Sequence, residues 1–177
     1  EKKVYLAFNK PRGIVCTAEK REKNNVIDYL SYPVRIYPVG RLDKDSEGLL
    51  LMTNDGAIVN GIMRARNRHE KEYQVEVNKE ITPEFLKKMA SGVPILDTVT
   101  RPCRIQKTGE RSFTIILTQG LNRQIRRMCE ALGYRVTKLK RVRIMNVHLK
   151  DLKTGEYRPL TEKELAELKK QIGEEKR

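Results

Sequence analysis

A continuous apolar run, Gly48–Thr53 (GLLLMT), constrains the fold of this chain more than any other segment. An uncharged run of this length is typical of a buried strand. Lys71–Val77 has a different pattern, because Tyr73, Val75 and Val77 alternate with polar residues and so share one face. Such alternation indicates a second strand. The two patterns together predict a sheet.

The remaining patterns add strands and helices without strict alternation. Further extended segments are predicted at 4–8, at 14–17, within 93–118 with a turn at 108–109, and within 136–149. Helices are predicted after an Asn24 or Asn25 cap, after Asp55, from Thr82 to Gly92, from Asn122 to Leu132 with Gly133 closing, and from a Thr161–Glu164 capping box onward. This order favours an α+β fold with a largely antiparallel sheet. The sequence lacks both β-α-β alternation and a GxGxxG motif, which argues against a dinucleotide-binding fold.

Length and charge narrow the class of protein. A chain of 177 residues is expected to form one domain, 1–177, built from two lobes at roughly 1–65 and 66–177. Lysine and arginine total 37 against 23 acidic residues, which gives a net charge of +14. Such an excess points to a polyanionic partner, the alternative being a basic protein with no nucleic-acid role.

Metal, disulfide and membrane functions find little support in the sequence. The three cysteines, Cys16, Cys103 and Cys129, are widely spaced, and His69 and His148 lie far apart. Neither spacing matches a zinc site or a disulfide framework. No apolar run reaches the roughly 18 residues of a membrane span. The sequence therefore predicts a cytoplasmic protein without metal or membrane association.

The segment Gly40–Gly56 (GRLDKDSEGLLLMTNDG) places a polar loop directly before the buried strand. A carboxylate on a loop that a rigid scaffold holds is a common form of active site, and Asp43 is in that position. A lone loop aspartate more often only caps a turn. The residues of this segment alone leave both interpretations open.

The same segment resembles the catalytic motif of the RsuA/RluA family of pseudouridine synthases. Gly40, Arg41, Leu42, Asp43 and the stretch 53–56 match that motif in order. Three more blocks match the family's other motifs: Asn9-Lys10-Pro11, Lys71-Glu72-Tyr73 with Val75, and Asn122–Met128. The segments 92–96, 119–122 and 143–147 resemble members that act on large-subunit ribosomal RNA.

The resemblance implies a fold, an activity and a partner. The fold would be a bent, mixed but largely antiparallel sheet flanked by helices, with an active-site cleft across the sheet. The activity would be conversion of a uridine in 23S ribosomal RNA to pseudouridine, by a monomer without a cofactor. Family members of this kind also carry an N-terminal S4 RNA-binding domain, which is expected to be missing from this chain.

The family's catalytic residues map onto Asp43, Tyr73 and Arg126. Asp43 would be the nucleophile, attacking either the base or the sugar. Arg126 would keep this carboxylate ionised, and helical spacing places it at the border of the apolar stripe formed by Ile125, Met128 and others. Tyr73 would stack on the target base and could help to remove its proton, although a tyrosine on such a strand face is more often a core residue.

Other residues are expected to contact RNA. Arg41 would contact the everted nucleotide, and Ile125 would line the pocket for its base. The remaining candidates for substrate or RNA contact are Leu42, Arg123, Arg127, Asn9 and Lys10. Two basic clusters fit a phosphate footprint, one formed by Arg64, Arg66, Arg68 and Lys71, the other by Lys138, Lys140, Arg141 and Arg143.

Three alternatives to this enzyme are considered. A non-catalytic RNA-binding or ribosome-assembly module would explain the charge but not the joint presence of Asp43, Tyr73 and Arg126. A synthase acting on a different RNA would share every motif. A nucleoside glycosidase would usually need a second catalytic carboxylate near the first, and neither Asp45 nor Glu47 stands out in that role.

Overall fold

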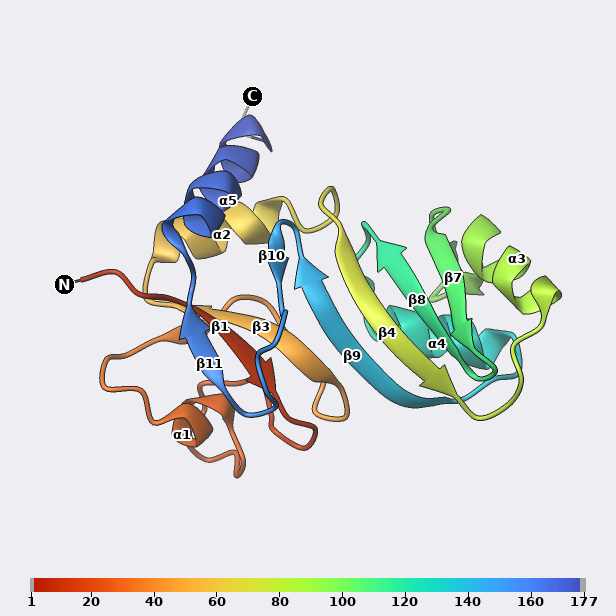
Figure 1. Ribbon diagram of the computed structural model, residues 1–177, viewed down its shortest axis with the longest axis horizontal. Helices are drawn as coiled ribbons and strands as arrows, with labels where there is room; N and C mark the ends of the chain where they lie inside the picture. The colour runs from red at the N-terminus through yellow and green to blue at the C-terminus, as the bar shows by residue number, and fades with distance from the viewer. Residues whose placement is uncertain (1, 176–177) are drawn as a thin grey trace. The chain divides into compact units, whose positions relative to one another are not determined.

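A computed structural model describes residues 2–175 of the chain, which divide into two compact units (Figure 1). The first unit comprises the residues up to Ala65 and those from Val142 onward. The second unit comprises Arg66–Arg141. The boundary after residue 65 is where the sequence suggests it. The second unit, however, does not extend to residue 177, because the chain returns to the first unit after Arg141.

In the first unit, β1 (Tyr5–Lys10) lies between two antiparallel partners, β3 (Glu47–Thr53) and β11 (Tyr157–Pro159). The short strand β2 (Tyr37–Pro38) pairs with β3, and the short strand β10 (Val147–His148) pairs with the end of β9 (Val136–Ile144). The unit also contains the helices α1 (Val26–Leu30), α2 (Gly56–Arg64) and α5 (Glu162–Glu175).

Both faces of the β1–β3 pair are buried, which explains the continuous apolar run in β3. On one face, Ala7, Leu49 and Leu51 share a core with residues of α2 and α5. On the other face, Phe8 and Leu50 belong to a second core that includes residues of α1. A strand covered on both faces has no polar side to display, so its residues do not alternate.

The second unit is a four-stranded sheet in the order β9-β4-β8-β7, with helices on one of its faces. The strands of this sheet are β4 (Lys71–Val77), β7 (Arg104–Gly109), β8 (Ser112–Leu117) and the first part of β9. A separate hairpin is formed by β5 (Pro94–Ile95) and β6 (Thr98–Val99). Its helices are α3 (Pro83–Ser91) and α4 (Gln124–Ala131). The registered pairings β4–β8 and β7–β8 are antiparallel.

The alternation in β4 and β8 separates an apolar face from a polar one. Val75, Phe113 and Ile115 are buried in one core with Phe85 of α3 and Met128 of α4. The intervening residues Gln74, Glu76, Ser112 and Thr114 are exposed or half-buried. The face that carries Tyr73 is therefore the one that packs against α3 and α4.

Most of the predicted helix signals are confirmed. The side chains of Asn25, Asp55 and Thr82 each accept a hydrogen bond from the first turn of their helix. The capping box is reciprocal, since the amide of Thr161 donates to Glu164 Oε1 and the amide of Glu164 donates to Thr161 Oγ1. The α+β class and the antiparallel pairing are likewise confirmed.

Four local predictions are wrong. The turn between β7 and β8 lies at residues 110–111 rather than at 108–109, because β7 continues through Gly109. The segment 14–17 is not a strand and forms only a single bridge, between Val15 and Asn25. The first strand does not end before Asn9, because β1 continues through Lys10. The N-cap of α4 is Arg123 rather than Asn122, and no side chain caps it.

Among the described residues, no helix is long and apolar enough to cross a membrane.

Candidate active site

The loop before β3 carries Asp43, which follows the buried Leu42 and begins a turn. Leu42 is only 6% exposed and packs in the core with Phe8 and Leu50. Arg41 is exposed and Asp43 is half-buried, so the two residues on either side of Leu42 are nearer to solvent. The amide of Ser46 donates to the carbonyl of Asp43 at 3.0 Å, which closes a turn directly after the carboxylate. The core anchors the loop at Leu42 and leaves Asp43 accessible.

Lys10 connects this loop to the end of β1. Its side chain is 0% exposed, and its ammonium donates to the carbonyls of Pro11 at 2.9 Å, Ile14 at 2.8 Å and Lys44 at 3.5 Å. The amide of Gly13 donates to the same Lys44 carbonyl at 2.7 Å. The segment after β1 and the loop that carries Asp43 are therefore tied together around one buried cation.

Burial lowers the pKa of Lys10 from 10.5 to about 8. The shift is smaller than burial alone would cause, because Cys16, Asp45, Asp43 and Glu47 all favour the charged form. Asp43 thus shares an electrostatic environment with Lys10 within the first unit.

The burial of Asn9 and Lys10 is at odds with the RNA contact that the sequence suggests for them. Asn9 is 1% exposed, and its side-chain amide donates to the carbonyl of Leu152 at 2.8 Å. Neither side chain has surface with which to touch a macromolecule. Both instead hold neighbouring segments of the first unit in place. The sequence does not reveal this because a lysine is almost never fully buried.

Tyr73 lies on β4 in the second unit. It is half-buried, pairs with Ile115 of β8 and packs at the edge of the core that includes Ile125. Tyr73 and Ile125 therefore contribute to the same core although they are far apart in the sequence. A half-buried ring at the edge of a core can offer its free face to a planar ligand.

Helix α4 presents the residues of the arginine motif on different sides. Ile125 and Arg126 are 4% and 7% exposed, while Arg123 is exposed and Arg127 is half-buried. A guanidinium as buried as that of Arg126 is stable only with an anion or several acceptors around it. Arg127 donates to the carbonyl and the side-chain oxygen of Asn122, at 3.0 and 2.9 Å.

Gln124 is a functional candidate that the sequence reasoning missed. It is 5% exposed, and its side chain accepts from the amide of Leu121 and donates to Gln119 and to the sulfur of Met128. Gln124 therefore fixes the loop that leads into α4. Its position directly before Ile125 and Arg126, as a polar residue on an otherwise apolar stripe, is the signal that could have identified it.

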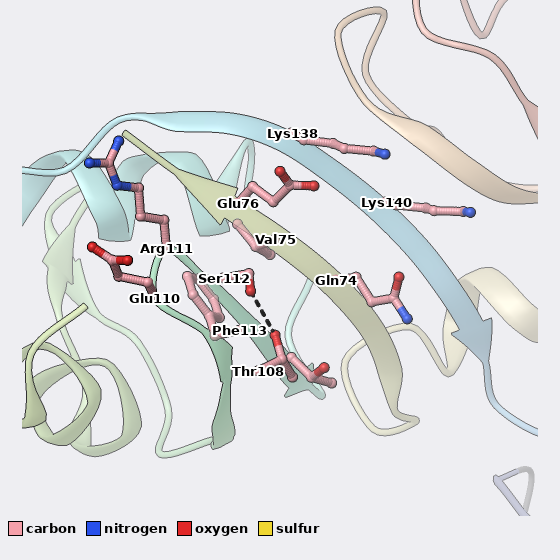
Figure 2. A pocket seen from close by; sticks show the side chains of 11 residues that line it. Gln74, Val75, Glu76, Thr108, Glu110, Arg111, Ser112, Phe113, Lys138 and Lys140 are labelled. Atoms are coloured by element: carbon pink, nitrogen blue, oxygen red, sulfur yellow. Dashed lines mark hydrogen bonds between the residues drawn. The ribbon is translucent and has the colours of Figure 1, made fainter. Parts of the chain in front are cut away.

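An open hollow lies on the polar face of the second unit's sheet (Figure 2). Lys138 and Lys140 extend into it from β9, and Glu76 of β4 lies beside them. Glu110 and Arg111 line it from the turn between β7 and β8. Its charges are mixed, and it lies on the opposite face of β4 from Tyr73, because Glu76 alternates with Tyr73 along the strand. Within residues 2–175, no cluster of side chains is suited to hold a metal ion.

Comparison with known proteins gives a consistent result. A sequence model described as RNA pseudouridylate synthase matches residues 4–131. The dual-specificity RNA pseudouridine synthase RluF of Salmonella typhi is 56% identical over 169 residues, which are 96% of this chain and 58% of that protein. Ribosomal large subunit pseudouridine synthase B of Bacillus subtilis is 36% identical over 177 residues, or 96% of this chain and 72% of that protein.

A solved structure has the same fold. The crystal structure of a pseudouridylate synthase superposes with a TM-score of 0.86 at 30% identity, covering 95% of this chain and 74% of that one. The chain thus spans less than two thirds of RluF but most of this solved structure. The resemblance of the segments 92–96, 119–122 and 143–147 is to RluF, and the identity to that protein confirms it.

Proposed function

The chain belongs to the family of RNA pseudouridylate synthases, and we propose that it isomerises a uridine of RNA to pseudouridine with Asp43 as the nucleophile. The observation that carries this proposal is the loop 40–46. It is anchored in the core by Leu42 and tied to the buried Lys10 through Lys44, so that the half-buried carboxylate of Asp43 is held on a rigid support. Rigid support with limited access to water is what covalent catalysis by a carboxylate requires.

The reaction is an isomerisation and needs no cofactor. The bond between N1 of uracil and C1′ of ribose breaks, the base turns, and a bond between C5 and C1′ forms. The proton on C5 leaves to solvent, and N1 gains one. Asp43 would attack the base or the sugar and so hold the fragments together through a covalent intermediate.

Arg126 is proposed to be the cationic partner of the Asp43 carboxylate. The support is its burial on α4, since a guanidinium that is 7% exposed needs a negative charge or several acceptors. Tyr73 is proposed to stack on the target base and to assist in removing the C5 proton. Ile125, in the same core as Tyr73, would line the pocket for the base.

The exposed arginines are proposed to hold the RNA. Arg41, two residues before Asp43, is exposed and would contact the everted nucleotide, whose extrusion from a stack costs about a few kcal/mol. Leu42, although predicted to touch the substrate, is buried and would act by anchoring the loop. Arg123 and Arg127 would contact phosphates on the exposed side of α4.

The substrate is proposed to be large-subunit ribosomal RNA, bound by a monomer in the cytoplasm. The support is the printed name of the Bacillus subtilis relative, a ribosomal large subunit synthase, together with the high identity to RluF. The name of RluF includes dual specificity, and a 35% identical relative from Yersinia pestis is a small-subunit synthase. A second RNA substrate is therefore the alternative that the comparisons favour.

The test uses ribosomal RNA labelled with tritium at C5 of uridine, because pseudouridine formation releases that label to water. The wild-type chain should release tritium, and Asp43→Asn should release none while it binds RNA nearly as well. Asp45→Asn is the matched control, since it makes the same chemical change two residues along the loop, and it should retain activity. Equal release by Asp43→Asn and wild type would show that the nucleophile is assigned wrongly.

A wild-type chain that binds ribosomal RNA but releases no tritium from it, or from small-subunit RNA, would favour the non-catalytic module. The release assay therefore separates the two classes of function, whereas a binding assay alone does not.

A further inference from the structure

Lys71 sits in an unusual position at the start of β4. It lies on the same face of the strand as Tyr73, two residues away, so that the two Cα atoms are roughly 7 Å apart. Its ammonium donates to the carbonyl of Arg66. A methyl group placed on Gly120 would lie 3.8 Å from the same nitrogen. Lys71 is thus held between the turn 66–70 and the loop that leads into α4.

The charged groups that act on Lys71 are all cations. Burial, followed by repulsion from Arg141, Arg66 and Arg101, lowers the pKa of Lys71 from 10.5 to about 8. Arg141, on β9, is only 6% exposed. An anion that binds beside Lys71 opposes this repulsion and stabilises its charged form.

The backbone around these cations is fixed by hydrogen bonds. The guanidinium of Arg101 donates to the carbonyl of Asn67 at 2.6 Å, and the backbone amide of Arg101 donates to Gln119 Oε1 at 2.8 Å. The side-chain oxygen of Asn67 accepts from the amide of Gly120 at 3.3 Å. The turn 66–70, Arg101 and the loop before α4 are therefore linked before any ligand arrives. Prior ordering of this kind lowers the entropic penalty of binding.

Building on the proposed function, we propose that Lys71, Arg66 and Arg101 form a binding site for one phosphate group of the RNA backbone, next to the nucleotide that Tyr73 receives. A phosphodiester offers two charged oxygens, which suit one ammonium as a point charge and guanidinium groups as forked donors. All three residues belong to the second unit. The hollow in Figure 2 is a weaker candidate for a phosphate, because Glu76 and Glu110 line it along with its cations.

Protonation of Lys71 should be linked to RNA binding. The groups that face its ammonium are Arg66 on the turn, Arg101 on the loop after β6 and Arg141 on β9, and an added phosphate opposes the repulsion from all three. RNA binding should therefore raise the pKa of Lys71 from about 8. The contribution of Lys71 to affinity is then present in full well below pH 8 and is lost as the pH rises above that value.

The experiment compares three variants of the chain in binding a fluorescein-labelled RNA stem–loop with a uridine in its loop. Lys71→Met removes the charge, Lys71→Arg keeps it at every accessible pH, and Lys87→Met removes an exposed charge from α3 as the matched control. Fluorescence anisotropy gives the affinity across about 50 to 300 mM KCl, where phosphate contacts set the slope. Inorganic phosphate is then added as a competitor, and the melting temperature of each variant is measured.

We expect Lys71→Met to weaken RNA binding roughly 10-fold and to make the logarithmic salt slope shallower by about 0.7 to 0.9. Lys71→Arg should keep the affinity at pH 7 and abolish the loss of affinity between pH 7 and pH 9. Lys87→Met should match wild type. Inorganic phosphate should compete with RNA more strongly for wild type than for Lys71→Met.

Unchanged affinity and salt slope in Lys71→Met would overturn the phosphate site, as would a wild-type chain that does not bind the stem–loop. An equal loss in Lys71→Met and Lys71→Arg with an unchanged slope would show a packing role instead, which also overturns it. Competition by phosphate that is equal in wild type and Lys71→Met would place the anion elsewhere. Tritium release by wild type is measured separately, so that the proposed function can hold when this site fails.

Discussion

Replacing Lys10 with methionine removes the buried cation and keeps most of the length of its side chain. In the folded protein this ammonium donates to the carbonyls of Pro11 and Ile14 at 2.9 and 2.8 Å, and more weakly to that of Lys44 at 3.5 Å. Only the Lys44 carbonyl has a second donor among the described contacts, the amide of Gly13. The variant therefore leaves the carbonyls of the half-buried residues Pro11 and Ile14 without this donor.

The expected loss of stability follows from two opposing effects. Two charge-assisted hydrogen bonds contribute about 3 to 6 kcal/mol. Against this, burial already disfavours the charge, since the pKa of Lys10 falls from 10.5 to about 8. That shift corresponds to about 3 kcal/mol. The difference leaves a net destabilisation at pH 7 of about 0 to 3 kcal/mol. The middle of that range, about 1.5 kcal/mol, lowers the melting temperature of a chain of this size by roughly 3 to 6 °C.

The difference in stability should depend on pH with a definite sign. The folded pKa of Lys10 lies below the unfolded value, so between about pH 8 and 10.5 the unfolded chain binds more protons than the folded one. The wild-type chain therefore gains stability over that window, and Lys10→Met does not. The gap in unfolding free energy between the two proteins should widen as the pH rises from 8 to 10.

Catalysis should be affected more than RNA binding. Without the tie between Lys10 and Lys44 the loop that carries Asp43 moves more freely, and a misplacement of about 1 Å can reduce a rate roughly 100-fold. Thermal unfolding by circular dichroism and single-turnover tritium release measure the two effects. Lys44→Met, which alters an exposed side chain on the same loop, is the control. An unchanged melting temperature, or a changed salt dependence of RNA binding with normal turnover, would refute the interior role of Lys10.

Three further substitutions test the fold itself. Glu164→Gln breaks the 2.7 Å ion pair with Arg158 and should lower the free energy of unfolding by about 1 to 3 kcal/mol at pH 7. Because this pair lowers the pKa of Glu164 to about 2, the difference from wild type in urea unfolding should shrink as the pH falls below 4.5. A difference that stays constant with pH would contradict the assignment. Gly92→Ala should lower the free energy of unfolding by about 2 to 4 kcal/mol, since φ is +123° and the added Cβ would lie 2.7 Å from the carbonyl oxygen of Thr100. A melting temperature equal to that of wild type would show that the backbone relaxes. Leu96→Asn should raise the free energy of unfolding by about 1 kcal/mol, because Leu96 is 47% exposed at φ +48° and asparagine tolerates that conformation. A loss of stability would mean that the leucine side chain makes stabilising contacts.

Local signals in the sequence predict local structure well. The alternation of Lys71–Val77 marks β4 to the residue, and the helix caps at Asn25 and Thr82 form as predicted. The Thr161–Glu164 capping box is formed in both directions. Each of these depends on residues within a few positions of one another, so the pattern contains the physical cause.

Features that depend on distant residues are not visible in the pattern. The return of the chain to the first unit after Arg141 depends on where β10 and β11 pair, and β11 has only three residues. The N-cap of α4 departs from the pattern for a local reason. The side-chain oxygen of Asn122 accepts a hydrogen bond from Arg127, and Arg123 adopts a left-handed conformation, φ +49°, that its residue type does not predict.

The candidate site divides in the same way. The motifs name Asp43, Tyr73 and Arg126, and the resemblance supplies their roles, which remain predictions. The sequence does not show that Lys10 is fully buried and belongs to the support of the loop, because a lysine after a strand looks like a surface residue. Burial is a property of the whole fold, and only the structure shows it.

Lys10 and Lys71 show how one residue type serves two purposes. The pKa of each falls to about 8, and burial is the largest cause in both. Around Lys10 the other contributions to the pKa favour the charged form, and backbone carbonyl oxygens accept hydrogen bonds from its ammonium. The protein itself therefore supplies the partners of this cation. Around Lys71 the other contributions are three arginines that oppose the charge. A cation whose charge is opposed by its surroundings gains most from an external anion, so the two lysines, each with a pKa of about 8, should respond to RNA in different ways.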